Sequence, residues 1–154
     1  MATRAMIRFA TRESGVSFSE HPEKYHAQFY RHYNGNVEYL GQDIVNSLLN
    51  SQTIDELEID NLSTFHDDAD YIYYIWQHMD KDSYISIFKR GEAHCPTCGN
   101  CVDDDEVMYE CIYVGMPCDL QQALHNMTSS YQTFEQYISN KCSNPKSVIT
   151  FPDV

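Results

Sequence analysis

Three cysteines at short, regular spacing are the residues of this sequence best suited to hold a metal ion. They lie in residues 94–101, His-Cys-Pro-Thr-Cys-Gly-Asn-Cys. Cys-Pro-x-Cys-Gly is typical of zinc knuckles, because proline and glycine shape a tight turn in which backbone amides can point at the thiolates. The pattern predicts a zinc site with Cys95, Cys98 and Cys101 as ligands. His94, a nearby Asp or a water molecule would complete the tetrahedron.

Other uses of these thiols stay open. A zinc ribbon needs a second Cys-x-x-Cys, which the chain lacks. If the loop is the tip of a hairpin, Cys111 lies some six strand residues, or roughly 20 Å, from Cys101 and is a poor fourth ligand. Cys-x-x-Cys-x-x-Cys also begins the ligand run of iron–sulfur clusters, but a nearby fourth cysteine is missing. A surface loop with free thiols is the simplest alternative. We therefore expect residues 91–106 to form a cysteine-rich loop insertion, with zinc as its candidate cofactor.

A second group, His66, Asp67, Asp68 and Asp70, has the residue types of a hydrolytic metal site. Such a site needs further His and Asp from other segments, and no matching segment is found, so solvated acids before a strand are the simpler interpretation. The chain also has no P-loop, Gly-x-Ser-x-Gly, His-Glu-x-x-His or dinucleotide-binding motif. These observations favour a function other than catalysis.

The charge of the chain is strongly negative and unevenly distributed. Its 154 residues hold 10 Lys and Arg against 23 Asp and Glu, for a net charge of -13. Residues 1–35 carry +2, residues 36–88 carry -10 and residues 89–154 carry -5. This excess repels nucleic acids and anionic membranes, and no apolar run approaches the roughly 20 residues of a membrane span. The first 15 residues have no apolar core of a secretory signal, so we expect a cytoplasmic protein.

Hydrophobic periodicity predicts an α+β fold with a mostly antiparallel sheet in a single domain, residues 1–154. Alternating or continuously apolar runs predict about five strands, at 4–11, 24–33, 70–76, 84–89 and 107–114. Apolar residues at helical spacing predict two main helices, at 36–50 and 117–138. On the second strand, alternation places one set of side chains outward, as an exposed polar and aromatic patch: His26, Gln28, Tyr30 and His32.

A resemblance adds a possible origin. Residues 29–35, Phe-Tyr-Arg-His-Tyr-Asn-Gly, and residues 38–41, Glu-Tyr-Leu-Gly, resemble a motif of small uncharacterised phage and prophage proteins that begin Met-Ala-Thr-Arg, as this chain does. The likeness covers the first third of the chain and residues 70–73. Asn34 replaces the Asp of that motif, and the cysteine-rich loop is absent from most relatives. The resemblance implies a phage-borne protein of the host cytoplasm and brings no activity with it.

Together these features suggest an acidic interaction protein that binds and inhibits or modulates a host protein that handles nucleic acid or acts in defence, with mimicry of DNA as one means. The expected partner is a protein with a basic surface, neither nucleic acid nor a membrane, and self-association stays open. A zinc-binding regulatory module and a small metal-dependent hydrolase are the alternatives. The candidate partner-binding residues are Asp55, Glu56, Glu58, Asp60, Asp67, Asp68, Asp70, Tyr30, Arg31 and His32.

Overall fold

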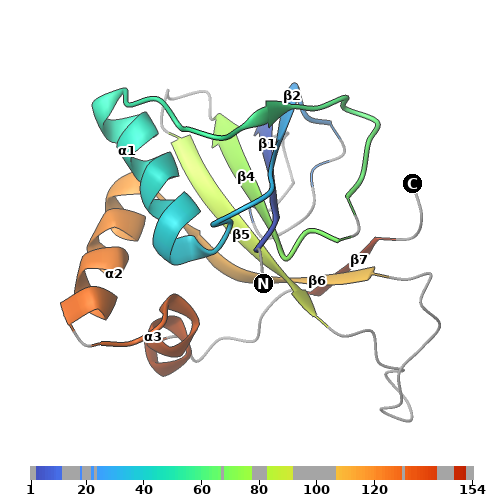
Figure 1. The fold of residues 1–154 in the computed structure, drawn as a ribbon. Coiled ribbons are helices and arrows are strands. Elements are labelled where there is room, and N and C mark those ends of the chain that lie inside the picture. Colours follow the sequence, from blue (N-terminus) through green and yellow to red (C-terminus); the bar gives the residue numbers. More distant parts are fainter. Residues whose placement is uncertain are drawn as a thin grey trace, which may run out of the picture.

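Two adjacent strands at the centre of the sheet are buried on both faces, and they pair in parallel (Figure 1). They are β1 (Ala5–Thr11) and β4 (Tyr71–Gln77), in a register that sets Ile7 opposite Tyr73. All residues of β4 except its last are buried, as expected for a strand covered on both sides. The chain between them must therefore leave β1, cross over and return beside it.

The structure is a computed structural model that describes residues 3–11, 18, 22, 24–66, 68–77, 83–91, 107–129, 131–141 and 148–151. Within these residues one sheet has the order β3-β2-β1-β4-β5-β6-β7, and every pairing except β1–β4 is antiparallel. The remaining strands are β2 (Ala27–Arg31), β3 (Glu58–Ile59), β5 (Ser83–Gly91), β6 (Val107–Gly115) and β7 (Val148–Phe151). The α+β class and the five expected strands are confirmed. Two short strands, β3 and β7, extend the sheet at its edges.

The helices pack together against one face of the sheet (Figure 1). They are a π-helical turn, η1 (Val37–Gly41), followed by α1 (Gln42–Asn50), α2 (Pro117–Ser129) and α3 (Phe134–Lys141). Within the described residues, no helix has the length and hydropathy that a bilayer-spanning segment requires. The helix expected over 36–50 is confirmed as η1 and α1 together.

The single helix expected over 117–138 is wrong, because the chain turns between α2 and α3. Tyr131 has a left-handed φ of 55°, and its N–H donates to Thr128 O. Thr133 and Gln136 then form a reciprocal capping box, in which each side chain accepts from the backbone N–H of the other. The apolar spacing continues across this break, which is why periodicity does not reveal it.

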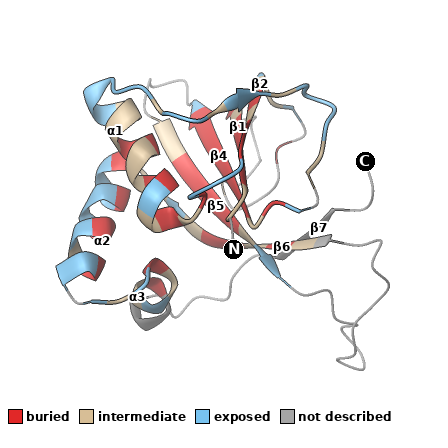
Figure 2. Cartoon of the chain, in the orientation of Figure 1, coloured by how far each residue is buried: buried red, intermediate tan, exposed pale blue. Residues whose placement is uncertain are grey.

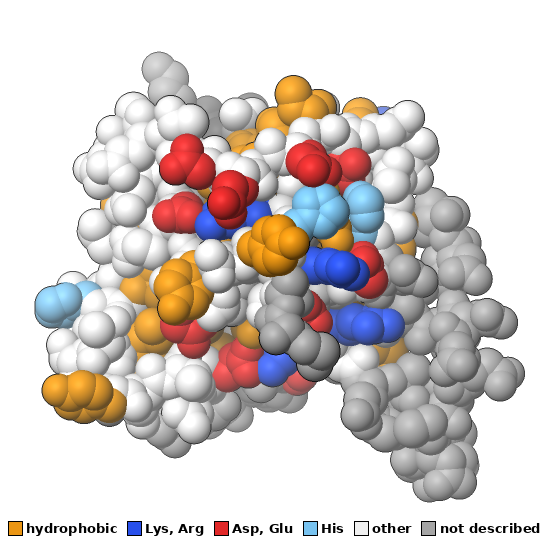
Figure 3. Space-filling model, in the orientation of Figure 1, with side chains coloured by type: hydrophobic (Ala, Val, Ile, Leu, Met, Phe, Trp, Pro, Cys, Tyr) orange, Lys and Arg blue, Asp and Glu red, His pale blue; other side chains and the backbone are white. Residues whose placement is uncertain are grey.

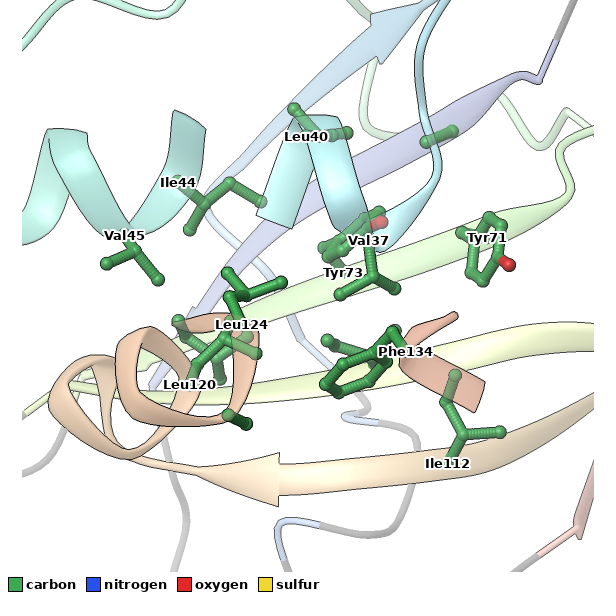
Figure 4. Close-up of a cluster of buried hydrophobic side chains, with 14 of the residues drawn as sticks. Val37, Leu40, Ile44, Val45, Tyr71, Tyr73, Ile112, Leu120, Leu124 and Phe134 are labelled. Carbon is green, nitrogen blue, oxygen red and sulfur yellow. The ribbon is translucent and has the colours of Figure 1, made fainter. Parts of the chain in front are cut away.

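A core of buried apolar side chains lies between the helices and the sheet (Figure 4). Leu40, Ile44 and Leu120 from the helical segments are fully buried there. The Tyr73 hydroxyl donates to Gly35 O at 2.6 Å. Gly35 lies so close to β1 that an added Cβ would be 2.8 Å from the Ala5 Cβ, so a side chain there would push the turn away from the sheet.

A second apolar cluster covers the opposite face of the sheet, and among its described members none comes from a helix. Its largest fully buried side chains include Trp76, Tyr74 and Phe88, with Phe18 and Phe65 packed against them. Figure 2 shows the central strands buried. Loop residues such as Phe65 and Ala69 belong to this cluster, so the face opposite the helices is covered as well.

Because of its buried tyrosines, the folded protein should lose stability at alkaline pH. Burial raises the pKa of Tyr73 and Tyr74 and, together with the Glu135 carboxylate, that of Tyr71. The folded state holds these protons more tightly than the unfolded state, so their stabilisation is complete below about pH 10 and is lost as pH rises further. We expect phenolate absorbance to rise in two phases, the second together with loss of the circular dichroism signal. One phase with an unchanged dichroism signal would contradict this.

Candidate functional site

The acidic segment, residues 55–70, leads from the helical layer to the second face of the sheet. It contains seven Asp and Glu and no Lys or Arg. Its residues 58–59 form β3 at the edge of the sheet, with Glu58 opposite Tyr30 and Ile59 opposite Phe29 of β2. It then passes over the second face, where Phe65 and Ala69 join the apolar cluster, and enters β4.

The buried Gln28 side chain fastens the acidic segment to the sheet. Its amide nitrogen lies 3.0 Å from Asp60 Oδ2, 2.7 Å from Thr64 O and 3.3 Å from Asn61 O. Its amide oxygen accepts from Arg8 Nε at 2.8 Å. Gln28 is 1% exposed, its bond to Arg8 is buried and its bonds to the acidic segment are partly buried, so losing them would leave a buried polar side chain without partners. Gln28 thus bonds to three residues of the acidic segment and keeps the segment over β2.

Arg8 is a buried cation beneath the same segment. It is 2% exposed, and its Nη1 donates to the Tyr74 hydroxyl at 3.2 Å. Its Cζ lies 4.2 Å from the Tyr25 ring centroid and 5.6 Å from that of Phe65. Within the described part of the chain no carboxylate pairs with it. Ring faces and neutral acceptors therefore compensate for its lost hydration.

His66 and two carboxylates of the segment are engaged in internal contacts. His66 Nε2 lies 2.5 Å from Asp60 Oδ2, and its ring stacks on Tyr30 with centroids 3.9 Å apart. The Tyr30 hydroxyl donates to Asp68 Oδ1 at 3.5 Å, while Asp68 Oδ2 pairs with Arg4 Nη1 at 2.5 Å. Burial and the Asp68 charge raise the pKa of Tyr30. These contacts hold the segment in place.

The acids of the segment therefore divide into two groups. Asp60 and Asp68 make the contacts above, and Asp70 accepts from the Arg4 backbone N–H at 3.0 Å. The others point to solvent and form, with one exposed apolar residue, a surface that we call the acidic edge: Asp55, Glu56, Glu58 and Ile59. Asp67 lies outside the described residues.

Acidic and basic side chains are mixed on the face of the molecule that Figure 3 shows. Figure 3 shows Asp and Glu side chains interleaved with Lys, Arg and His. Glu58 Oε2 of the acidic edge lies 3.1 Å from Nε2 of the exposed His32. Asp55 and Glu56 make no ion pair within the described part of the chain. The candidate surface is thus narrower than the acidic third of the sequence.

The exposed patch expected over residues 26–32 is wrong at its centre, where the acidic segment covers this face, while His26 and His32 at its ends are exposed as expected. Gln28 is buried and Tyr30 is 3% exposed. Arg31 is also buried: its Nη1 pairs with Asp43 Oδ2 of α1 at 2.7 Å and its Nε donates to Tyr33 O at 2.9 Å. The structure therefore places Tyr30 and Arg31 in structural contacts, and of the expected partner-binding trio only His32 keeps an exposed side chain.

The described members of the proposed hydrolytic group do not converge. His66 bonds to Asp60, whereas Asp68 and Asp70 bond to the side chain and to the backbone N–H of Arg4, so these side chains face different polar groups and not a common point. No cluster of three metal-ligating side chains occurs in the described parts of the chain.

The expected zinc ligands, Cys95, Cys98, Cys101 and His94, lie outside the described residues, so zinc stays a prediction. Cys111, in contrast, is a core residue. Burial raises the pKa of its thiol to about 11, and its Sγ donates to Tyr113 O at 3.7 Å.

Replacing Gln28 tests how the segment is attached. We expect Gln28→Met to lower the free energy of unfolding by about 1–3 kcal/mol, because it removes the acceptor of the buried Arg8 Nε and the donor that Asp60, Asn61 and Thr64 share. Amide exchange should accelerate most over residues 60–64. The control is Gln122→Met on the exposed side of α2, which should change stability by about 0.5 kcal/mol or less. Equal effects of the two substitutions would contradict the role of Gln28.

Comparisons of this chain with protein-family models, with curated proteins and with solved structures find no match. The resemblance to phage proteins stays a prediction. The functional argument therefore rests on the geometry of the acidic segment.

Proposed function

We propose that this chain is a binding protein whose acidic edge engages a basic surface of a protein that handles nucleic acid or acts in host defence. The observation that carries the proposal is the exposure of Asp55, Glu56 and Glu58 within four residues, on a segment without Lys or Arg. Exposed carboxylates of this kind raise the association rate with a basic partner and disfavour acidic ones.

The fixed position of the acidic edge supports this proposal. Gln28 attaches the segment to β2 immediately beyond β3, through Asp60, Asn61 and Thr64. A surface that is already ordered loses less conformational entropy on binding than a mobile tail does. The acidic edge is thus better prepared for binding than the same charges on a disordered segment.

Competition with nucleic acid is the proposed means of action. A basic groove filled by carboxylates is closed to phosphates, since both neutralise the same Lys and Arg side chains. Such an interaction weakens with salt, because exposed charges are screened over about 8–10 Å at physiological ionic strength. Phage origin would make the partner a bacterial protein.

Neutralising the acidic edge tests the proposal. The immobilised chain is compared with D55N/E56Q/E58Q for capture of basic proteins from bacterial lysate, with elution by a salt gradient. We expect the variant to bind roughly three- to a hundredfold more weakly, at about 0.2–1 kcal/mol for each lost exposed ion pair. The control variant D103N/D104N/D105N makes the same change in net charge and should keep binding.

Three results would contradict the proposal. The chain captures no more protein than bare resin, its capture is insensitive to salt, or the control loses as much binding as D55N/E56Q/E58Q. In the last case net charge, and not the acidic edge, would account for the binding.

A further inference from the structure

β3 forms one end of the sheet, and its register leaves backbone groups pointing outward. The Asp60 N–H donates to Gln28 O at 2.9 Å, and Glu58 stands opposite Tyr30. Residues in an antiparallel pair alternate between bonding to the neighbouring strand and pointing away from it. The backbone N–H and C=O groups of residues 58 and 60 therefore point toward β2, whereas those of Ile59 point away from the sheet.

Ile59 is exposed in its side chain as well as in its backbone. The residue is 86% exposed, and within the described residues its outward N–H and C=O have no hydrogen-bond partner. Proteins usually protect such an edge with Pro, a bulge, Lys or a covering loop. Here the neighbouring charges, Asp55, Glu56 and Glu58, are all negative. They repel the same edge of a second copy of this chain and attract a basic strand.

The two faces of β3 differ in chemistry. Ile59 stands opposite Phe29, which packs against the core on the helix side. Glu58 stands opposite Tyr30, which belongs to the cluster on the second face. A strand beside β3 would place a residue next to Ile59 on the helix side, and the residues before and after it on the side of Glu58. An apolar residue between two basic ones fits this arrangement.

We propose that β3 binds an extended basic segment of the partner protein as an added antiparallel strand. The proposal rests on the proposed function and adds its binding mode: main-chain hydrogen bonds to Ile59, apolar contact with its side chain, and Lys or Arg beside Glu58. The bonded stretch is short, because Asn61 O already accepts from Thr64 N and Gln28 Nε2. The proposed contact is therefore small, of the transient kind.

Peptides that differ only in backbone methylation test this proposal with the full chain. The parent is capped Lys-Val-Lys-Val-Lys-Val-Lys. In an antiparallel pairing, a residue directly opposite Ile59 points its N–H at β3, and its neighbours point theirs away. Methylating the three Val nitrogens should therefore weaken binding about tenfold or more, while methylating three Lys nitrogens should change it by less than about twofold. Affinity is measured by isothermal titration calorimetry.

Strand addition is overturned if the two methylated peptides bind alike or if the parent does not bind. Neither result contradicts the proposed function as long as D55N/E56Q/E58Q captures less basic protein than the wild type and D103N/D104N/D105N captures as much. Conversely, the capture experiment can fail while the peptides still bind in a methylation-sensitive way. β3 would then bind an added strand, but the proposal that its partner handles nucleic acid or acts in defence would be wrong. The two failures are thus distinguishable.

A substitution in the chain provides an independent test. Ile59→Pro removes the outward N–H, and proline is tolerated on an edge strand whose N–H faces solvent. We expect this variant to bind the parent peptide about tenfold more weakly, and Ile59→Val, which keeps the N–H and an apolar side chain, to bind it as the wild type does. Equal affinities of both variants would overturn the proposal.

Discussion

The sheet is apolar on both faces, but the helices cover one of them, and the rest of the structure depends on how the other face is closed. Part of that cover is an acidic segment, whose polar backbone must be satisfied against buried strands. Gln28 supplies the contacts, with donors for Asp60, Asn61 and Thr64 and an acceptor for the buried Arg8. One side chain therefore links the central strands to the segment that ends the sheet.

This arrangement gives the acids of one segment two different uses. Asp60, Asp68 and Asp70 accept hydrogen bonds from His66, Tyr30 or Arg4 and fix the path of the chain. Asp55 and Glu56, earlier in the segment, make no ion pair within the described residues and stay in water beside β3, where Glu58 pairs with the exposed His32. Burying these negative charges without partners would oppose folding. They lie instead at the exposed edge of the sheet, where a binding partner can reach them.

Local sequence patterns predict the main strands and the first helix, but they do not predict burial or pairing that depends on contacts between distant segments. Strands 4–11 and 70–76 were predictable because apolar runs and alternation are local, and so was the helix over 36–50. Alternation cannot tell whether a loop covers the second face, so Gln28 and Tyr30 were expected outside and are buried. The two-residue β3 has no periodicity of its own and exists through its pairing with β2. The site shifted accordingly, from the whole acidic segment to its exposed part.

Residue-resolved amide hydrogen exchange of the free chain tests the central claim most directly, namely that β3 is fixed on β2 with its outer edge open. The Asp60 N–H, bonded to Gln28 O, should be protected from exchange, as should that of Tyr30 on the facing strand. The Ile59 N–H, which points outward, should exchange close to the rate of an unstructured peptide. Protection of Ile59 equal to that of Asp60, or no protection at either residue, would contradict the account.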